Sequence, residues 1–215
     1  MTPKLLAEAI GTFVLVFTIG LARMQFDVPA PLAVGMALMA VVYAGWHISG
    51  AHYNPAVTLA VMLRGKCTVQ DAVPYVIFQI LGAVAAAFAA KYMFAEGAAS
   101  ALAEAAKMKA FPTGQAFLAE FLFTFALAWV VLNVATSKET AGNSNYGLAI
   151  GFTILVGAFS VGGISGGAFN PAVAVGACLM SLIQWGNVWV HIAADLLGGV
   201  LAALTFKCLS TADRE

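Results

Sequence analysis

The sequence predicts an all-α membrane protein in which six transmembrane helices and two half-helices form an inverted repeat. Three observations support this prediction: the composition, the length of the apolar segments, and a motif that occurs twice. Of the 215 residues, 62% are hydrophobic and 9% are charged, whereas a soluble domain carries about 25% charged residues. We therefore expect an integral, multi-pass membrane protein.

Six apolar segments are long enough to cross a bilayer. A helix of about 20 residues spans a hydrocarbon core of roughly 30 Å, and no segment shows the alternating pattern of a membrane β-barrel. The predicted spans are residues 5–24, 30–47, 69–94, 115–135, 146–161 and 185–209. The N-terminal span lacks the charged start and cleavage site of a signal peptide, so we expect it to be retained.

The tripeptide Asn-Pro-Ala occurs at residues 54–56 and again at residues 170–172, inside a longer matching frame. The first frame reads His-Ile-Ser-Gly-Ala-His-Tyr-Asn-Pro-Ala-Val and the second reads Gly-Ile-Ser-Gly-Gly-Ala-Phe-Asn-Pro-Ala-Val. Asn followed by Pro is typical of a helix N-cap and first turn. The apolar pieces that follow, residues 54–63 and 170–183, are too short to cross and are predicted to be half-helices that enter the membrane from opposite faces.

Two further matches show that the whole chain is a repeat. The segment from Glu8, Glu-Ala-Ile-Gly-Thr-Phe-Val-Leu, corresponds to Glu-Phe-Leu-Phe-Thr-Phe-Ala-Leu from Glu120. Gln-Ile-Leu-Gly-Ala-Val from Gln79 corresponds to Asp-Leu-Leu-Gly-Gly-Val from Asp195. Because each half holds three spans, the second half must be inverted relative to the first, with its working site near the midplane. We expect one domain over residues 1–215, with repeats at about 1–95 and 113–212.

Two half-helices that begin near the membrane centre would direct their positive ends at the same spot. Each end carries about half a positive charge and several unpaired N–H groups, so cations would be repelled. If Asn54 and Asn170 each turn an amide N–H toward a shared pore, a passing oxygen accepts two hydrogen bonds, and the proton-conducting chain of waters is interrupted. This pattern predicts passage of neutral solutes and exclusion of protons and ions.

The paired Asn-Pro-Ala frames, the Glu-x-x-x-Thr at the start of each half and the six-plus-two segment plan resemble the aquaporin, or major intrinsic protein, family. The resemblance covers almost the whole chain. It implies a right-handed helical bundle and a homotetramer with a pore in each subunit. It also implies that Glu8 and Glu120 hold the half-helix loops and that His52 lies near the cytoplasmic mouth. The pore motifs would be Asn54, Pro55 and Ala56 with Asn170, Pro171 and Ala172.

The chain departs from the family at the outer constriction, the selectivity filter. Most members place Arg after the second Asn-Pro-Ala, and this chain has Val173. Counting without gaps from the two Asn residues puts the other filter positions on Val34, Ala158 and Gly167. Four small or apolar residues predict a wider filter that passes water, glycerol-like polyols and neutral metalloid acids such as arsenous or boric acid.

An alternative interpretation is a strict water-selective aquaporin, in which Phe159, Phe169 or Met36 refills the gap. Three other classes are weaker. An intramembrane serine protease could use Ser165 in Gly-x-Ser-x-Gly with His191, but Ser-Gly recurs at residues 49–50 as part of the repeated loop. An ion-coupled transporter needs ionisable groups at the midplane, and residues 146–186 contain none. A structural junction protein would show no flux.

The expected partners are small neutral solutes and membrane lipid. A net charge of zero without a basic cluster argues against nucleic acid. Cys67, Cys178 and Cys208 are unevenly spaced with no Cys-x-x-Cys pair, so we expect neither a metal site nor a disulfide framework. We also expect no cofactor, and no enzyme activity because the Gly-x-Ser-x-Gly match is explained by the repeated loop. The basic residues favour both termini in the cytoplasm, in the plasma or inner membrane. Those on the predicted cytoplasmic side are Lys4, Arg64, Lys66, Lys138, Lys207 and Arg214, and those on the other are Arg23, Lys91, Lys107 and Lys109.

Overall fold

The computed structural model describes residues 2–24, 29–94 and 111–210, and these contain helices and no strand. Six helices are long and apolar enough to cross a membrane. They are α1 (Pro3–Met24), α2 (Ala30–Ser49), α4 (Val69–Met93), α6 (Thr113–Thr136), α7 (Tyr146–Ser165) and α9 (Val188–Leu209). The two half-helices are α3 (Pro55–Leu63) and α8 (Pro171–Leu179), and short 3₁₀ turns are η1 (Lys138–Thr140) and η2 (Trp185–Asn187).

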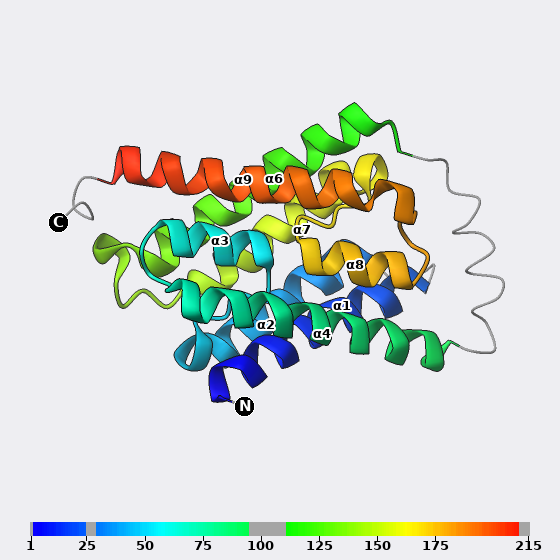
Figure 1. The fold of residues 1–215 in the computed structure, drawn as a ribbon, viewed down its shortest axis with the longest axis horizontal. Coiled ribbons are helices and arrows are strands. Elements are labelled where there is room, and N and C mark those ends of the chain that lie inside the picture. The colour runs from blue at the N-terminus through cyan, green and yellow to red at the C-terminus, as the bar shows by residue number, and fades with distance from the viewer. Residues whose placement is uncertain (1, 25–28, 95–110, 211–215) are drawn as a thin grey trace.

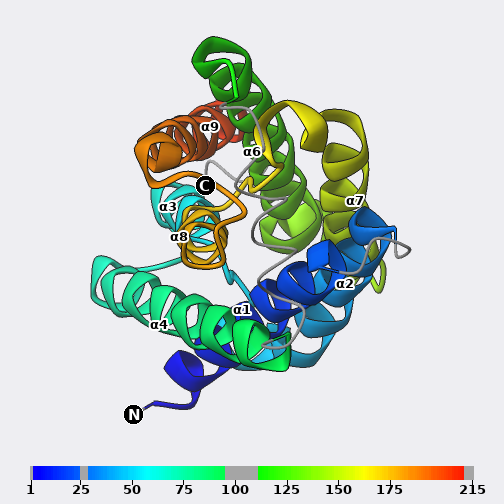
Figure 2. The ribbon, with the colours of Figure 1, turned by 90° about the vertical axis from the view of Figure 1, so that its right-hand side faces the viewer.

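The half-helices lie end to end along the long axis of the molecule, with their N-termini toward its middle (Figure 1). In the view along that axis, α8 lies in front of α3, between α4 and α9 (Figure 2). The two described ends of the chain lie at the same end of the bundle (Figure 1). The predicted plan of six spans and two half-helices is therefore confirmed.

The two halves pack in the same way. In the first, α1 contacts α2 and α4, and in the second, α6 contacts α7 and α9. Each half-helix then packs against the long helix of the other half, α3 on α9 and α8 on α4. The halves are thus interlocked, because neither half-helix can leave without uncovering its partner in the other repeat.

Close packing at these crossings depends on glycine. A Cβ added to Gly82 of α4 would lie 2.3 Å from the Ala9 carbonyl oxygen of α1. A Cβ on Gly199 of α9 would lie 2.6 Å from the Ala56 carbonyl oxygen at the start of α3. Both contacts are with backbone, which cannot rotate away, so larger residues would separate the helices.

The second half-helix is shorter than predicted, ending at Leu179 and not at residue 183. Both half-helices end in a Schellman motif, in which one residue takes a left-handed conformation and two N–H groups bond back to the last turn. Gly65 supplies this residue after α3 with φ +85°, and Ser181 supplies it after α8 with φ +61°. The Leu182 N–H then donates to the Ala177 carbonyl at 2.8 Å. Because position 181 is Ser and not Gly, the sequence carries no recognisable signal for the end of α8.

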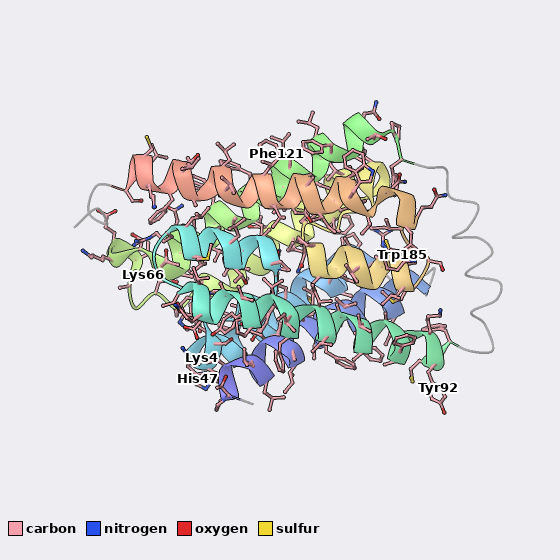
Figure 3. The ribbon with its side chains drawn as sticks, in the orientation of Figure 1. Lys4, His47, Lys66, Tyr92, Phe121 and Trp185 are labelled. Atoms are coloured by element: carbon pink, nitrogen blue, oxygen red, sulfur yellow. The ribbon has the colours of Figure 1, made fainter. Side chains whose placement is uncertain are left out.

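Polar and amphipathic side chains mark the two ends of the bundle. Lys4, His47 and Lys66 lie at the end that holds the chain termini, and Tyr92 and Trp185 lie at the other (Figure 3). Tyr and Trp favour the membrane–water interfaces. Of the basic residues used to predict orientation, Lys107, Lys109 and Arg214 lie outside the described residues.

Candidate functional site

The half-helices begin where the sequence predicts, and each is capped by its Asn. The Asn54 Oδ1 accepts hydrogen bonds from the backbone N–H groups of Ala56 at 2.8 Å and Val57 at 3.4 Å. The Asn170 Oδ1 accepts from Ala172 at 2.9 Å and Val173 at 3.4 Å. Pro55 and Pro171 occupy the first helical position, where no N–H is required. The side-chain oxygen of each Asn is thus committed to its helix, leaving the amide nitrogen to face outward.

The amide nitrogens tie the two half-helices together. The Asn54 Nδ2 donates to the Phe169 carbonyl at 2.8 Å, and the Asn170 Nδ2 donates to the Tyr53 carbonyl at 2.9 Å. Each Asn therefore caps its own half-helix and hydrogen-bonds the loop that leads into the opposite half-helix. These bonds fix the distance between the two positive helix ends.

A buried carboxylate holds the first loop. Glu8 of α1 is fully buried, and its Oε1 accepts from the Ser49 hydroxyl at 2.6 Å and the His52 N–H at 3.0 Å. Its Oε2 accepts from the Tyr53 N–H at 2.7 Å and the Gln79 amide at 2.7 Å. Four donors converge on one side chain, so a single residue sets the path of residues 49–53.

Glu120 of α6 holds the second loop in the same way. Its Oε1 accepts from the Ser165 hydroxyl at 2.5 Å and the Ala168 N–H at 3.0 Å, and its Oε2 accepts from the Phe169 N–H at 2.6 Å. The loop-supporting role that the family resemblance implies for Glu8 and Glu120 agrees with these bonds.

The held residues have an unfavourable backbone conformation. Tyr53 has φ +49° and Phe169 has φ +48°, a left-handed conformation that costs a residue with a side chain about 1–2 kcal/mol. In both cases the strained residue donates its N–H to a carboxylate and its carbonyl accepts from the opposite Asn. The strain is offset by these two bonds, which aim the Tyr53 and Phe169 carbonyls at the centre of the bundle.

The hydrogen-bond networks around Glu8 and Glu120 differ at one position, which is Gln79 in the first half and Asp195 in the second. In the first half the Gln79 amide bridges Glu8 and the Thr58 hydroxyl, at 2.7 and 3.0 Å. In the second half the corresponding residue is Asp195, whose Oδ1 accepts from the Thr124 hydroxyl at 2.8 Å and which also interacts with Glu120. Gln79 Oε1 and Asp195 Oδ2 have no hydrogen-bond partner among the described residues.

His191 accompanies the buried carboxylates of the second half. It is fully buried on α9, one turn before Asp195. Its Nε2 lies 3.8 Å from the Glu120 carboxylate and 2.9 Å from the Ser165 carbonyl, and its Nδ1 lies 3.1 Å from the Asn187 carbonyl. The two ring nitrogens thus lie against backbone carbonyls of the second loop and of the turn before α9.

A narrow cavity of about 30 Å³ runs past the two Asn side chains. Its wall includes Asn54, Asn170 and three of the four predicted filter residues, Val34, Gly167 and Val173. Ala158 is not on this wall but lies close to Gly167, since a Cβ added to Gly167 would be 3.6 Å from the Ala158 Cα. The remaining wall is mainly aliphatic, made by residues that include Leu15, Ile19, Leu38, Val42, Leu127, Val131, Ile150 and Ile154.

Three side chains were considered as groups that could refill the selectivity filter, and none of them lies on the cavity wall. Met36 and Phe159 are 51% and 59% exposed on the outside of the chain. Phe169 is buried and packs against the Phe123 ring, with centroids 5.4 Å apart. The lumen is instead narrowed by branched aliphatic side chains of the long helices, which the ungapped count from the motifs did not include.

His52 lies at the end of this cavity nearer the chain termini. It also borders a second pocket of about 300 Å³ that opens at that end, together with Trp46, Ser49 and Lys66. Its Nδ1 lies 3.2 Å from the Thr58 hydroxyl. Burial lowers the pKa of His52, and this effect outweighs the opposing one of the nearby Glu8 carboxylate. A neutral imidazole is therefore expected at this mouth at pH 7.

The geometry does not support a serine nucleophile. The Ser165 hydroxyl donates to Glu120 and accepts from the Gly167 N–H at 3.1 Å, and it is fully buried. His191 contacts the backbone carbonyl of Ser165 and not its hydroxyl. The serine of the Gly-x-Ser-x-Gly sequence thus serves the loop, as its counterpart Ser49 does.

Three parts of the site were not predicted as such. The hydroxyls of Ser49 and Ser165 were visible only as members of a repeated frame, and Gln79 and Asp195 only as a repeat match. The third is Arg23, whose Nη2 donates to the Gly166 carbonyl of the second loop at 2.9 Å. The sequence carries no signal for it beyond its charge, because this contact depends on how α1 is rotated in the bundle.

The chain matches known proteins over nearly its whole length. The family model described as "Major intrinsic protein" matches residues 1–206. A glycerol uptake facilitator protein-like 6 from Lactiplantibacillus plantarum is 36% identical, over 98% of this chain and 99% of that protein. Aquaporin NIP1-1 from Zea mays is 36% identical, over 96% of this chain and 74% of that protein.

A solved structure has the same fold. The X-ray structure of the aquaglyceroporin from Plasmodium falciparum superposes with a TM-score of 0.80 and 22% sequence identity, covering 98% of this chain and 97% of that one. Together with the paired, cross-linked half-helices, these matches show that the chain belongs to the major intrinsic protein family.

Proposed function

We propose that this protein is a passive channel for small uncharged solutes. The observation that carries the proposal is the meeting of two Asn-capped helix ends at one narrow cavity. An Asn amide nitrogen has two N–H groups, of which one is given to the opposite loop. The second N–H of Asn54 and of Asn170 is the group that would bind a passing oxygen.

Exclusion of charge follows from the same geometry. Both half-helices direct their positive ends at the cavity, which opposes cations and protonated water. The aliphatic wall has no polar groups that could replace the hydration shell of an ion, so both cations and anions would incur a desolvation cost on entry. A passive channel also fits a family whose relatives here are named as facilitators and aquaporins, and does not require enzyme activity.

We propose a solute class that includes water, glycerol-like polyols and neutral metalloid acids such as arsenous or boric acid. Val34, Gly167 and Val173 present no charge and little bulk at the outer part of the cavity. The name of the Lactiplantibacillus relative, a glycerol uptake facilitator-like protein, supports polyol passage. Arsenous acid is uncharged at pH 7 and similar to glycerol in its set of hydroxyl groups.

The second candidate is a strict water-selective channel. A cavity of about 30 Å³ has room for only a few water molecules, and its narrowing side chains come from four different long helices. If these side chains do not yield, water passes and polyols do not.

We also propose a homotetramer in the plasma or inner membrane, with the termini in the cytoplasm. Large apolar residues are exposed along several long helices, including Phe88 of α4, Leu118 and Leu122 of α6, and Phe152 and Phe159 of α7. These surfaces would contact lipid or neighbouring subunits, because they cannot face water.

Stopped-flow light scattering on proteoliposomes tests this proposal. Water, glycerol, urea and arsenous acid are compared for the native chain and Val173→Arg. We expect the native protein to pass water and at least one larger solute, and Val173→Arg to reduce the larger solute more than water. Passage of water alone, unchanged in Val173→Arg, would support the water-selective candidate. No flux above empty liposomes would reject the channel.

A further inference from the structure

Two residues of α1 line the cavity, and the basic residue Arg23 follows them on the same face of the helix. Leu15 and Ile19 both lie on the cavity wall. Residues four apart lie on the same face of a helix, so Arg23 is the next member of this row. It is one turn farther from the chain termini than Ile19, beyond the level of the two Asn residues.

The Arg23 side chain reaches the loop that forms the filter. Its Nη2 donates to the Gly166 carbonyl at 2.9 Å. Gly166 directly precedes Gly167, which lies on the cavity wall. A Cβ added to Gly162 would be 3.6 Å from the same Nη2. The guanidinium therefore lies where α1, the end of α7 and the second loop come together.

The lining face of α7 leads to the same point. Ile150 and Ile154 line the cavity, and steps of four continue through Ala158 to Gly162. Ala158 lies close to the filter residue Gly167, and Gly162 lies close to the Arg23 guanidinium. Two helices thus place the Arg23 guanidinium one turn outside the filter, and Arg23 remains exposed there.

We propose that Arg23 is a specificity-determining residue of the outer mouth, supplied by α1 because Val173 carries no charge. Its positive charge opposes entry of small cations, and its N–H groups, several in one planar fork, offer hydrogen bonds to oxygen atoms of neutral solutes. This inference rests on the proposed channel function. It explains how a filter of Val34, Ala158, Gly167 and Val173 can exclude cations at its entrance.

The test measures permeability to methylammonium and to urea in the same proteoliposomes for native protein, Arg23→Gln, Arg23→Lys and Lys91→Gln. Lys91→Gln is a matched control, since Lys91 lies at the same end of the bundle but donates to the Leu179 carbonyl of α8 at 3.5 Å, whereas Arg23 donates to Gly166 in the loop that carries Gly167. We expect Arg23→Gln to raise the methylammonium-to-urea ratio about tenfold, the effect of one nearby charge in a partly hydrated site. Arg23→Lys, which keeps the charge, should restore most of the exclusion, and added salt should weaken it.

The outcomes separate this inference from the proposed function. If the native protein passes urea but Arg23→Gln leaves the ratio unchanged, or changes it no more than Lys91→Gln does, the inference is wrong and the channel stands. If Arg23→Lys is as permeable to methylammonium as Arg23→Gln, charge is not the cause and the inference is also wrong. If the native protein passes neither water nor urea, the channel itself is wrong.

Discussion

Replacing Glu8 with Gln tests how the first half-helix is held in place. The substitution keeps the size of the side chain and turns one acceptor oxygen into an NH₂ group. With its remaining oxygen toward Ser49 and His52, the new amide faces the Tyr53 N–H and the Gln79 amide. The Gln79 amide can rotate to present its oxygen, which has no partner among the described residues, but the Tyr53 N–H is fixed in the backbone.

The expected cost is set by the Tyr53 bond. A hydrogen bond to a charged acceptor contributes about 1.5–3 kcal/mol, and a buried donor left without a partner adds to the loss. The bond also offsets part of the strain at Tyr53, with φ +49°. We expect the free energy of unfolding to fall by about 2–4 kcal/mol. Because the Tyr53 carbonyl accepts from Asn170, water flux should fall as well.

Thermal unfolding in detergent, followed by tryptophan fluorescence, measures the first effect, and stopped-flow water flux measures the second. A loss of about 2–4 kcal/mol corresponds to a fall in Tm of roughly 5–15 °C for a chain of this length. Glu139→Gln removes a charge from an exposed residue and should change neither quantity. If Glu8→Gln matches the native protein in both, the carboxylate does not hold the loop and the reasoning fails.

Three further changes test separate contacts. In Gly199→Ala the new Cβ would lie 2.6 Å from a backbone oxygen, so the free energy of unfolding should fall by about 1–3 kcal/mol and water flux should fall too. Gly186→Ala, with open space around the new Cβ, should change neither. Thermal unfolding of the two variants tests this. Asp195→Asn supplies an amide donor toward Glu120, so Tm should hold or rise. A fall in Tm of several degrees would contradict the view that the side chains of Asp195 and Glu120 bond to each other. Burial lowers the pKa of His52 in the folded protein. As the pH falls from about 7 to about 5, the unfolded chain therefore takes up a proton on His52 before the folded protein does, and stability should fall. Tm measured across this range should show the fall, and His52→Gln should reduce it.

The helices and their caps could be predicted because their causes are local. Six segments are long and apolar enough to need a bilayer, and Asn54-Pro55 and Asn170-Pro171 each combine an N-cap with a first-turn Pro. The stop after α8 could not be predicted, because Ser181 adopts a left-handed conformation that Ser rarely takes. Its conformation comes from the packing of the half-helix and not from the residue itself.

The supports of the loops could be predicted in part. The repeat and the family resemblance identified Glu8 and Glu120, but the sequence does not show that Tyr53 and Phe169 take positive φ angles. Neither does it show that each Asn amide bonds the opposite loop, since these contacts join residues more than 100 positions apart. Such contacts depend on the interlocking of the two halves.

The filter shows the same division. Counting from the motifs placed Val34, Gly167 and Val173 on the cavity wall. The count follows residues aligned with the motifs, so it found neither the aliphatic side chains that narrow the lumen nor Arg23. Both depend on the rotation of each long helix about its axis, which a segment apolar on all faces does not reveal.

The central claim is that the opposed half-helices pass neutral molecules and exclude charge. It is tested most directly by measuring solute flux and the decay of a pH gradient in the same proteoliposomes. We predict that water and urea cross much faster than in empty liposomes, while the pH gradient decays no faster than in empty liposomes. A pH gradient that collapses along with the rise in solute flux would contradict the account.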